Sequence, residues 1–108
     1  MKYINEFTKA IHSLNKIKVT FKAKKYGNIE ITRICAPMDY SLSKKYKDNI
    51  ERYHFWDFQG TKGGHTESIL EINIVSIEVL NDHFSPESFV TWKVPYNWSI
   101  KRDWGSKS

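Results

Sequence analysis

The sequence predicts a mainly β fold of the α+β class: a small five-stranded antiparallel barrel, preceded by a helix and followed by a short C-terminal helix or tail. Apolar residues recur at helical spacing in the first fourteen positions, whereas from position 16 onward they alternate with polar residues, as in half-buried strands. The strand-like segments are short and are joined by hairpin-length turns. A chain of 108 residues has room for one such domain.

The first element is a helix predicted over residues 3–14. Its apolar side chains follow one another at spacings of three and four, which places them in one stripe: Ile4, Phe7, Ile11 and Leu14. A helix of this length is marginal by itself, so the stripe must pack on another element. We expect the helix to cover an open end or a face of the barrel.

Residues 16–24 predict the first strand, because β-branched and aromatic residues alternate there with lysines and a threonine. Tyr26-Gly27-Asn28 predicts a turn, and residues 29–36 predict the returning strand. Pro37 is expected to end it, since proline cannot donate to a strand ladder. Residues 38–51 then predict a long basic loop with three clustered lysines: Lys44, Lys45 and Lys47.

Residues 52–59, 65–70 and 74–80 predict the last three strands. The final one is the clearest, because Val75, Ile77 and Val79 alternate with Ser76 and Glu78. Beyond it, Ser85 and Pro86 are typical of an N-cap and a first helical position.

The aromatic segment 52–58 allows two interpretations. On a strand Tyr53, Phe55 and Asp57 share one face, while His54, Trp56 and Phe58 share the other, so both faces are largely apolar. In one interpretation, one face fills the barrel and the other packs beneath the helix or the C-terminal residues. In the other, one face stacks a nucleobase or another planar ring, with an arginine at its edge.

Residues 1–90 are expected to form the barrel and its helix, and residues 91–108 a tryptophan-rich tail. Trp92, Trp98 and Trp104 are spaced six apart. Exposed tryptophans are uncommon, so we expect the tail to wrap back onto the barrel. The alternative is an arm that binds nucleic acid or a protein partner.

Composition narrows the function classes. The net charge of +5 comes from residues 1–51, which suits phosphate-bearing partners but also a lysine-coated surface. A single cysteine, Cys35, suits a reducing cytoplasm, and we expect neither a membrane span nor a secretory signal. The four histidines lack close metal-ligand spacing, and Cys35 is expected to be a buried, inert thiol. We therefore expect no enzyme activity, no metal and no cofactor.

The order of the segments resembles that of the WYL domain family. The resemblance spans roughly residues 7–89 and rests on the helix, strand and glycine turn of residues 7–28, on Arg33 followed by Pro37, and on the strand and phenylalanine of residues 69–84. The aromatic segment stands where that family carries its Trp-Tyr-Leu tripeptide. The arginine-rich stretch that precedes the family's last strand is absent here.

The resemblance implies an SH3-like (Sm-like) barrel of the kind found as ligand-sensing modules in bacterial transcriptional regulators. No helix-turn-helix precedes the first helix, so a complete DNA-reading regulator is not expected by that route. The family's ligands are nucleotides or nucleic acid, held by the aromatic segment and nearby arginines. Carried over to this sequence, that implies a ligand face with added charge from the loop lysines: Arg33, Arg52, Tyr53, His54 and Trp56, with Lys44, Lys45 and Lys47.

We therefore expect a non-enzymatic barrel that binds a nucleotide or nucleic acid. The alternative is a protein-interaction domain, or a homodimer, that uses the tail and an exposed strand edge.

Overall fold

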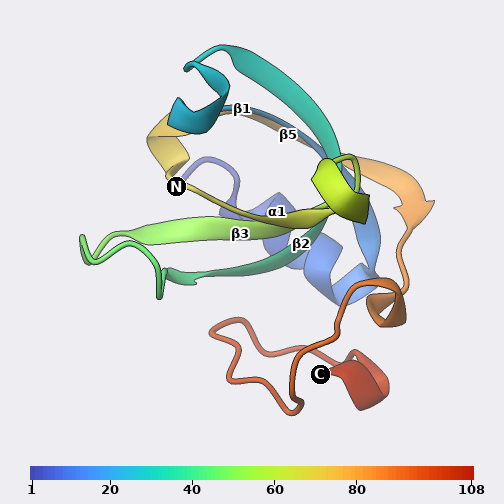
Figure 1. The fold of residues 1–108 in the computed structure, drawn as a ribbon. Coiled ribbons are helices and arrows are strands. Elements are labelled where there is room, and N and C mark those ends of the chain that lie inside the picture. Colours follow the sequence, from blue (N-terminus) through green and yellow to red (C-terminus); the bar gives the residue numbers. More distant parts are fainter.

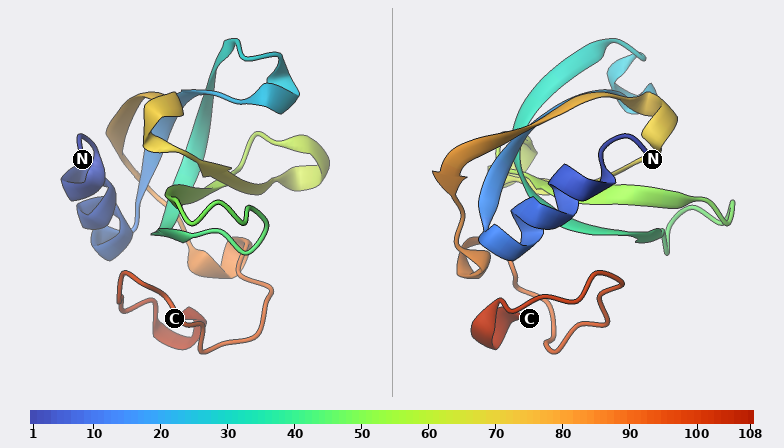
Figure 2. Two further views of the ribbon diagram at one scale, coloured as in Figure 1. Left: turned by 90° about the vertical axis from the view of Figure 1, so that its left-hand side faces the viewer. Right: turned by 180° about the vertical axis from the view of Figure 1, so that it is seen from behind.

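The computed structural model describes residues 1–108, with the side chain of Lys62 outside the description. One helix, α1 (Ile4–Ser13), packs against a curved antiparallel sheet (Figures 1 and 2). Within the described residues the sheet has five strands in the order β4-β3-β2-β1-β5. Their bounds are β1 Asn15–Lys22, β2 Glu30–Leu42, β3 Glu51–Asp57, β4 His65–Ile69 and β5 Ile74–His83. The predicted α+β class, the five antiparallel strands and the N-terminal helix are confirmed.

The helix buries the predicted stripe against the sheet, with Phe7 and Ile11 fully buried. It ends at Ser13. The next residue, Leu14, has a left-handed backbone conformation, and its N–H donates to the Ala10 carbonyl as the chain turns into β1. Among the helices of the described residues, none has the length and hydropathy needed to cross a bilayer.

The core lies between α1 and the inward faces of the strands. Val19 and Phe21 of β1 and Tyr53 and Phe55 of β3 are fully buried, as their alternation predicts. The rings of Phe21 and Phe55 meet edge to face at 5.5 Å, and those of Phe7 and Tyr53 do so at 5.0 Å. Aromatic pairs of this geometry contribute about 0.5–1.5 kcal/mol beyond their burial.

The prediction that Pro37 ends the second strand is wrong, because β2 continues to Leu42. The last residue of β2 paired with β1 is Cys35, so Pro37 lies where β1 needs no donor from it. The pairing of β2 with β3 also shifts register between Pro37 and Asp39, which absorbs the missing N–H in a bulge. The predicted basic loop therefore shortens to residues 43–50, and it still carries the three lysines.

Strand β5 forms as predicted but lies at one edge of the sheet. Val75 and Val79, whose alternation predicts the strand, are each 40% exposed, and Ile74 is the residue it buries. The pairing with β1 shifts register near both ends, so a strict two-residue period does not describe which side chains reach the core.

The segment after β5 returns beneath the sheet. Pro86–Ser88 makes a single 3₁₀ turn rather than a longer helix, and the Ser88 hydroxyl donates to the Ser85 carbonyl. The tail (residues 91–108) then lies below β2 and β3, as both figures show. Trp98 and Trp104 are buried, and the Trp104 indole N–H donates to the Ile11 carbonyl at 3.0 Å.

Candidate ligand-binding site

A cavity of about 750 Å³ lies between the sheet and the tail, and we call it the tail cavity. Its floor comes from β2, β3 and β4: Ser41, His54, Thr66 and Ser68. Its opposite wall is aromatic and comes from the tail: Trp92, Tyr96 and Trp98. Two loop lysines, Lys44 and Lys45, border it. The volume lies within the range of small-molecule sites, and a mostly apolar wall facing a few polar groups is typical of them.

The alternation of side chains along each strand explains why the floor residues face the tail cavity. Because Tyr53 and Phe55 of β3 point into the core, His54 between them points to the opposite face. Ser68 of β4 is the cross-strand partner of His54, and Asp39 of β2 is its partner on the other side. The floor is therefore a row across three neighbouring strands.

Hydrogen bonds fix the ring of His54. Its Nε2 lies 2.9 Å from the Ser41 carbonyl, and its Nδ1 lies 2.8 Å from the Ser68 hydroxyl. Burial lowers the pKa of His54 and Arg52 acts in the same direction, while the Ser41 carbonyl and Asp39 oppose the shift. The imidazole is therefore neutral at pH 7.

Asp39 attaches the aromatic wall to the sheet. Its carboxylate accepts hydrogen bonds from the backbone N–H groups of Ser99 at 3.0 Å and Ile100 at 2.9 Å. The guanidinium of Arg102 lies 3.6 Å from the same carboxylate and over the rings of Trp98 and Trp104, 3.8 and 4.5 Å from their centroids. Burial lowers the pKa of Arg102 to about 10 against the opposing effect of Asp39, so the group stays charged at neutral pH.

A second cavity of about 400 Å³ adjoins the first, and we call it the lysine cavity. The two cavities share Lys45, Thr66 and Ser68. Lys24 and Lys25, from the turn after β1, border the lysine cavity. The two cavities are therefore neighbours, and we call the pair the groove: aromatic rings of the tail line the first cavity, and lysines border both.

Of the residues expected to form the ligand face, the structure brings His54, Lys44 and Lys45 to the tail cavity. Tyr53 does not reach it: the ring is fully buried and its hydroxyl donates to Glu71. Trp56 is on the same face as His54, but it stacks on Phe89 with a centroid distance of 5.6 Å. Tyr53 and His54 therefore lie on opposite faces of β3, because successive residues of a strand point to opposite sides.

The two predicted arginines are engaged in ion pairs instead. Arg33 Nε lies 3.2 Å from the buried carboxylate of Asp57. Arg52 is 6% exposed and makes two bonds with Asp48, at 2.9 and 2.8 Å, beneath the ring of Tyr46. Lys47 lies exposed in the loop. Arg52 thus stabilises the loop between β2 and β3, and Arg33 stabilises the end of β3.

Sequence reasoning missed the tail as a wall of the site and the hydroxyls of β4. The tail was expected to pack on the sheet, but its sequence does not predict where a cavity remains between the tail and the sheet. Ser68 carried a weak signal, since the alternation of residues 65–70 places it beside His54 once the register of β3 with β4 is known.

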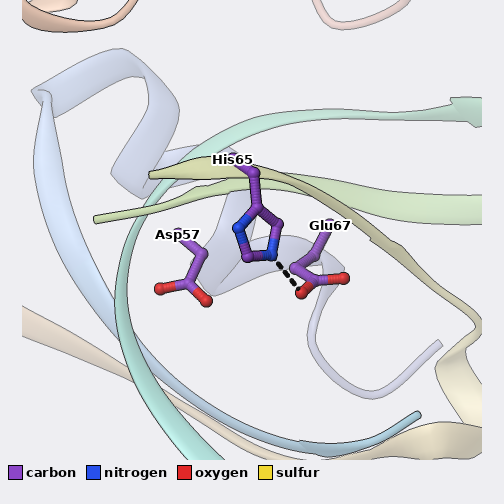
Figure 3. Close-up of side chains that lie close together, drawn as sticks. All are labelled: Asp57, His65 and Glu67. Atoms are coloured by element: carbon purple, nitrogen blue, oxygen red, sulfur yellow. Dashed lines mark hydrogen bonds and ion pairs between the residues drawn. The ribbon is translucent and has the colours of Figure 1, made fainter. Parts of the chain in front are cut away.

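A separate polar cluster lies at the other end of β3 and β4 (Figure 3). Asp57, His65 and Glu67 offer ligand atoms within 4.8 Å of one another, and the His65 ring N–H donates to Glu67 at 2.7 Å. Burial alone would raise the pKa of Glu67, but hydrogen bonds from His65, Lys25 and Tyr26 hold it below its ordinary value.

The charges of this cluster are already balanced. Lys25 lies 2.9 Å from the Glu67 carboxylate, and Arg33 pairs with Asp57. A divalent cation would have to enter beside two fixed positive charges, which repel it at short range. We interpret the cluster as a structural network that connects the turn after β1 to β4. The sequence analysis did not consider it, although the His-x-Glu spacing on one strand face was a signal for it.

The chain was also compared with known proteins. It matches no protein family model, no curated protein and no solved structure. The function is therefore inferred from the geometry of the groove.

Proposed function

We propose that this domain binds a nucleotide or single-stranded nucleic acid in the groove, without catalysing a reaction, as a sensing or regulatory module. The observation that carries the proposal is that the tail cavity, with its aromatic wall, and the lysine cavity share Lys45, Thr66 and Ser68 in their linings. A nucleotide has the same two parts, a planar base and an anionic phosphate.

The aromatic end supplies a stacking surface. Tyr96 is 37% exposed, and its ring lies 6.1 Å from that of Trp92. Stacking of a base on an aromatic ring contributes about 1–3 kcal/mol and tolerates any sequence. Lys44 Nζ lies over the Tyr96 ring at 5.2 Å, so a base that stacks on this face would displace the ammonium group.

The basic end supplies attraction for phosphate. Lys24 and Lys45 border the lysine cavity and supply this attraction, whereas the charge of Lys25 is already balanced by Glu67 on the same cavity. Neutralising phosphates releases condensed counterions, so this part of the affinity should fall as salt rises. Lysine acts here as a point charge, which suits a flexible phosphate chain.

We further propose that the sheet is an SH3-like barrel and that the chain is a divergent relative of the WYL domains. Three features support this. Strand β1 is paired with both β2 and β5, a 3₁₀ turn (Glu71–Asn73) joins β4 to β5, and the N-terminal helix packs on the sheet. In this proposal residues 1–90 form the barrel, and the tail is an addition that builds the ligand wall.

Quenching of tryptophan fluorescence by a hexathymidylate, at low and at moderate salt, tests the proposal. We expect binding that weakens as salt rises, and about tenfold weaker binding by Tyr96→Ala. Lys45→Ala should also weaken binding and reduce its salt dependence. Lys22→Ala, an exposed lysine at the end of β1, is the matched control and should change little.

Two results would count against nucleic-acid binding. One is the lack of any quenching at low salt. The other is quenching that responds neither to salt nor to Tyr96→Ala.

A second candidate is self-association through β5. This edge strand exposes Val75 and Val79, and Ile72 beside it is 87% exposed. An exposed strand edge can pair with a second copy of the chain. In sedimentation velocity, Val79→Lys should then shift a dimer to monomer, whereas Ser76→Lys on the same strand should not. A monomer at all concentrations for the unmodified chain would exclude this candidate.

A further inference from the structure

We propose that the His54–Ser68 pair makes the floor of the tail cavity a hydrogen-bond acceptor at neutral pH, and so selects ligands that present an N–H donor there. For a nucleotide, such a donor is an exocyclic amino group. This inference rests on the proposed function, because it names which bases the groove prefers.

The tautomer of His54 follows from its two partners. A backbone carbonyl can only accept, so the 2.9 Å contact with Ser41 places a proton on Nε2. In the neutral ring Nδ1 then has a lone pair, and at 2.8 Å it must accept the Ser68 hydroxyl proton. The hydrogen of Ser68 is thereby committed to His54.

The remaining lone pairs of the Ser68 oxygen are what a ligand meets. Ser68 borders both the tail cavity and the lysine cavity, so it stands where base and phosphate ends join. A ligand carbonyl placed opposite it would face another acceptor, whereas an amino group would complete a hydrogen bond. Once a ligand covers Ser68, leaving its polar group unpaired is the costly alternative, which is why such a site can discriminate.

Protonation of His54 would reverse this polarity. A proton added at Nδ1 becomes a donor to Ser68 Oγ, and the serine hydroxyl hydrogen is then released toward the cavity. The charged groups facing His54 are Asp39 on β2 and Arg52 on β3, with Glu51, Lys44 and Lys45 around the same cavity. Since Asp39 and Arg52 carry opposite charges, their effects oppose each other, and burial keeps the ring neutral until the solution is acidic.

The first measurement needs no ligand. Nitrogen-15 chemical shifts of the imidazole in the full chain should show a neutral ring with its proton on Nε2 at pH 7. A proton on Nδ1, or a charged ring at pH 7, would overturn the inference.

The second measurement compares adenosine 5′-monophosphate, which has an amino group at its six-position, with inosine 5′-monophosphate, which has a carbonyl there. We expect adenosine monophosphate to bind about tenfold more tightly at pH 7.5. The preference should disappear in Ser68→Ala, a small change on a half-exposed residue that leaves the fold intact. On acidification below the pKa of His54 it should shrink or reverse.

The outcomes separate the two proposals. If both nucleotides bind equally at pH 7.5, the selection is wrong and the proposed function stands. If the preference persists in Ser68→Ala, another group makes it and the inference is overturned. If neither nucleotide nor hexathymidylate binds, the proposed function fails and the selection fails with it.

Discussion

Replacing Asp39 by alanine should detach the tail from the sheet and open the tail cavity. Asp39 is 5% exposed and holds three groups of the tail: two backbone N–H groups at 3.0 and 2.9 Å, and the Arg102 guanidinium at 3.6 Å. All three belong to a segment about sixty residues away along the chain. The carboxylate is therefore the main polar attachment between β2 and the tail.

The size of the effect can be worked from these contacts. A hydrogen bond to a charged acceptor contributes about 1.5–3 kcal/mol, so the two N–H bonds together contribute roughly 3–6 kcal/mol. Removing one partner of a buried ion pair costs about 3–5 kcal/mol, because the other charge is left buried. The two estimates describe overlapping losses, so we expect the free energy of unfolding to fall by about 3–5 kcal/mol.

Urea unfolding followed by tryptophan fluorescence measures this change. Asp82→Ala is the matched control, because Asp82 pairs with Lys16 at 3.7 Å while 75% exposed, and exposed pairs contribute about 0–1 kcal/mol. Adding Arg102→Met to Asp39→Ala should recover part of the loss, since an apolar side chain then replaces an uncompensated charge. A loss for Asp39→Ala no larger than that of the control would refute this account of the tail.

Three further changes test other parts of the structure. The pKa of Glu67 is lower in the folded state than its ordinary value of 4.5, so the ionised carboxylate stabilises the fold above pH 4.5. This contribution is lost as the pH falls through the folded pKa. The free energy of unfolding of Glu67→Gln should therefore depend less on pH in that acidic range. Gly64→Ala should destabilise more than Gly105→Ala in thermal unfolding, because both positions have positive φ but only at Gly64 would the added Cβ lie 2.7 Å from Trp56 Nε1. Tyr53→Phe removes the hydroxyl that donates to Glu71 and should cost about 1.5–3 kcal/mol in urea unfolding, leaving nucleotide affinity unchanged. An equal loss of stability at the two glycines would contradict the close approach at Gly64. An unchanged pH profile for Glu67→Gln would contradict the role of its hydrogen bonds, and weaker nucleotide binding by Tyr53→Phe would contradict the placement of Tyr53 outside the groove.

Local patterns were sufficient for the helix and for most strand faces. The spacing of Phe7 and Ile11 places both on one side of α1, and the period of two in β3 buries Tyr53 while it turns His54 outward. They failed at Pro37, because whether a missing N–H ends a strand depends on which neighbour would have needed it. The alternation of residues also failed to predict the exposure of Val75 and Val79, because an edge strand with register shifts does not bury a full face.

The sequence by itself determined the class of fold, the helix, the strands and the orientation of their side chains, since each of these depends on residues within a few positions of one another. Only the tertiary structure decided the site. The tail cavity exists because Asp39 on β2 binds the backbone near residue 100, and its floor exists because the pairing of β2, β3 and β4 brings His54 beside Ser68. Contacts between residues so distant along the chain leave no local periodicity, so they could be found only once the chain had folded.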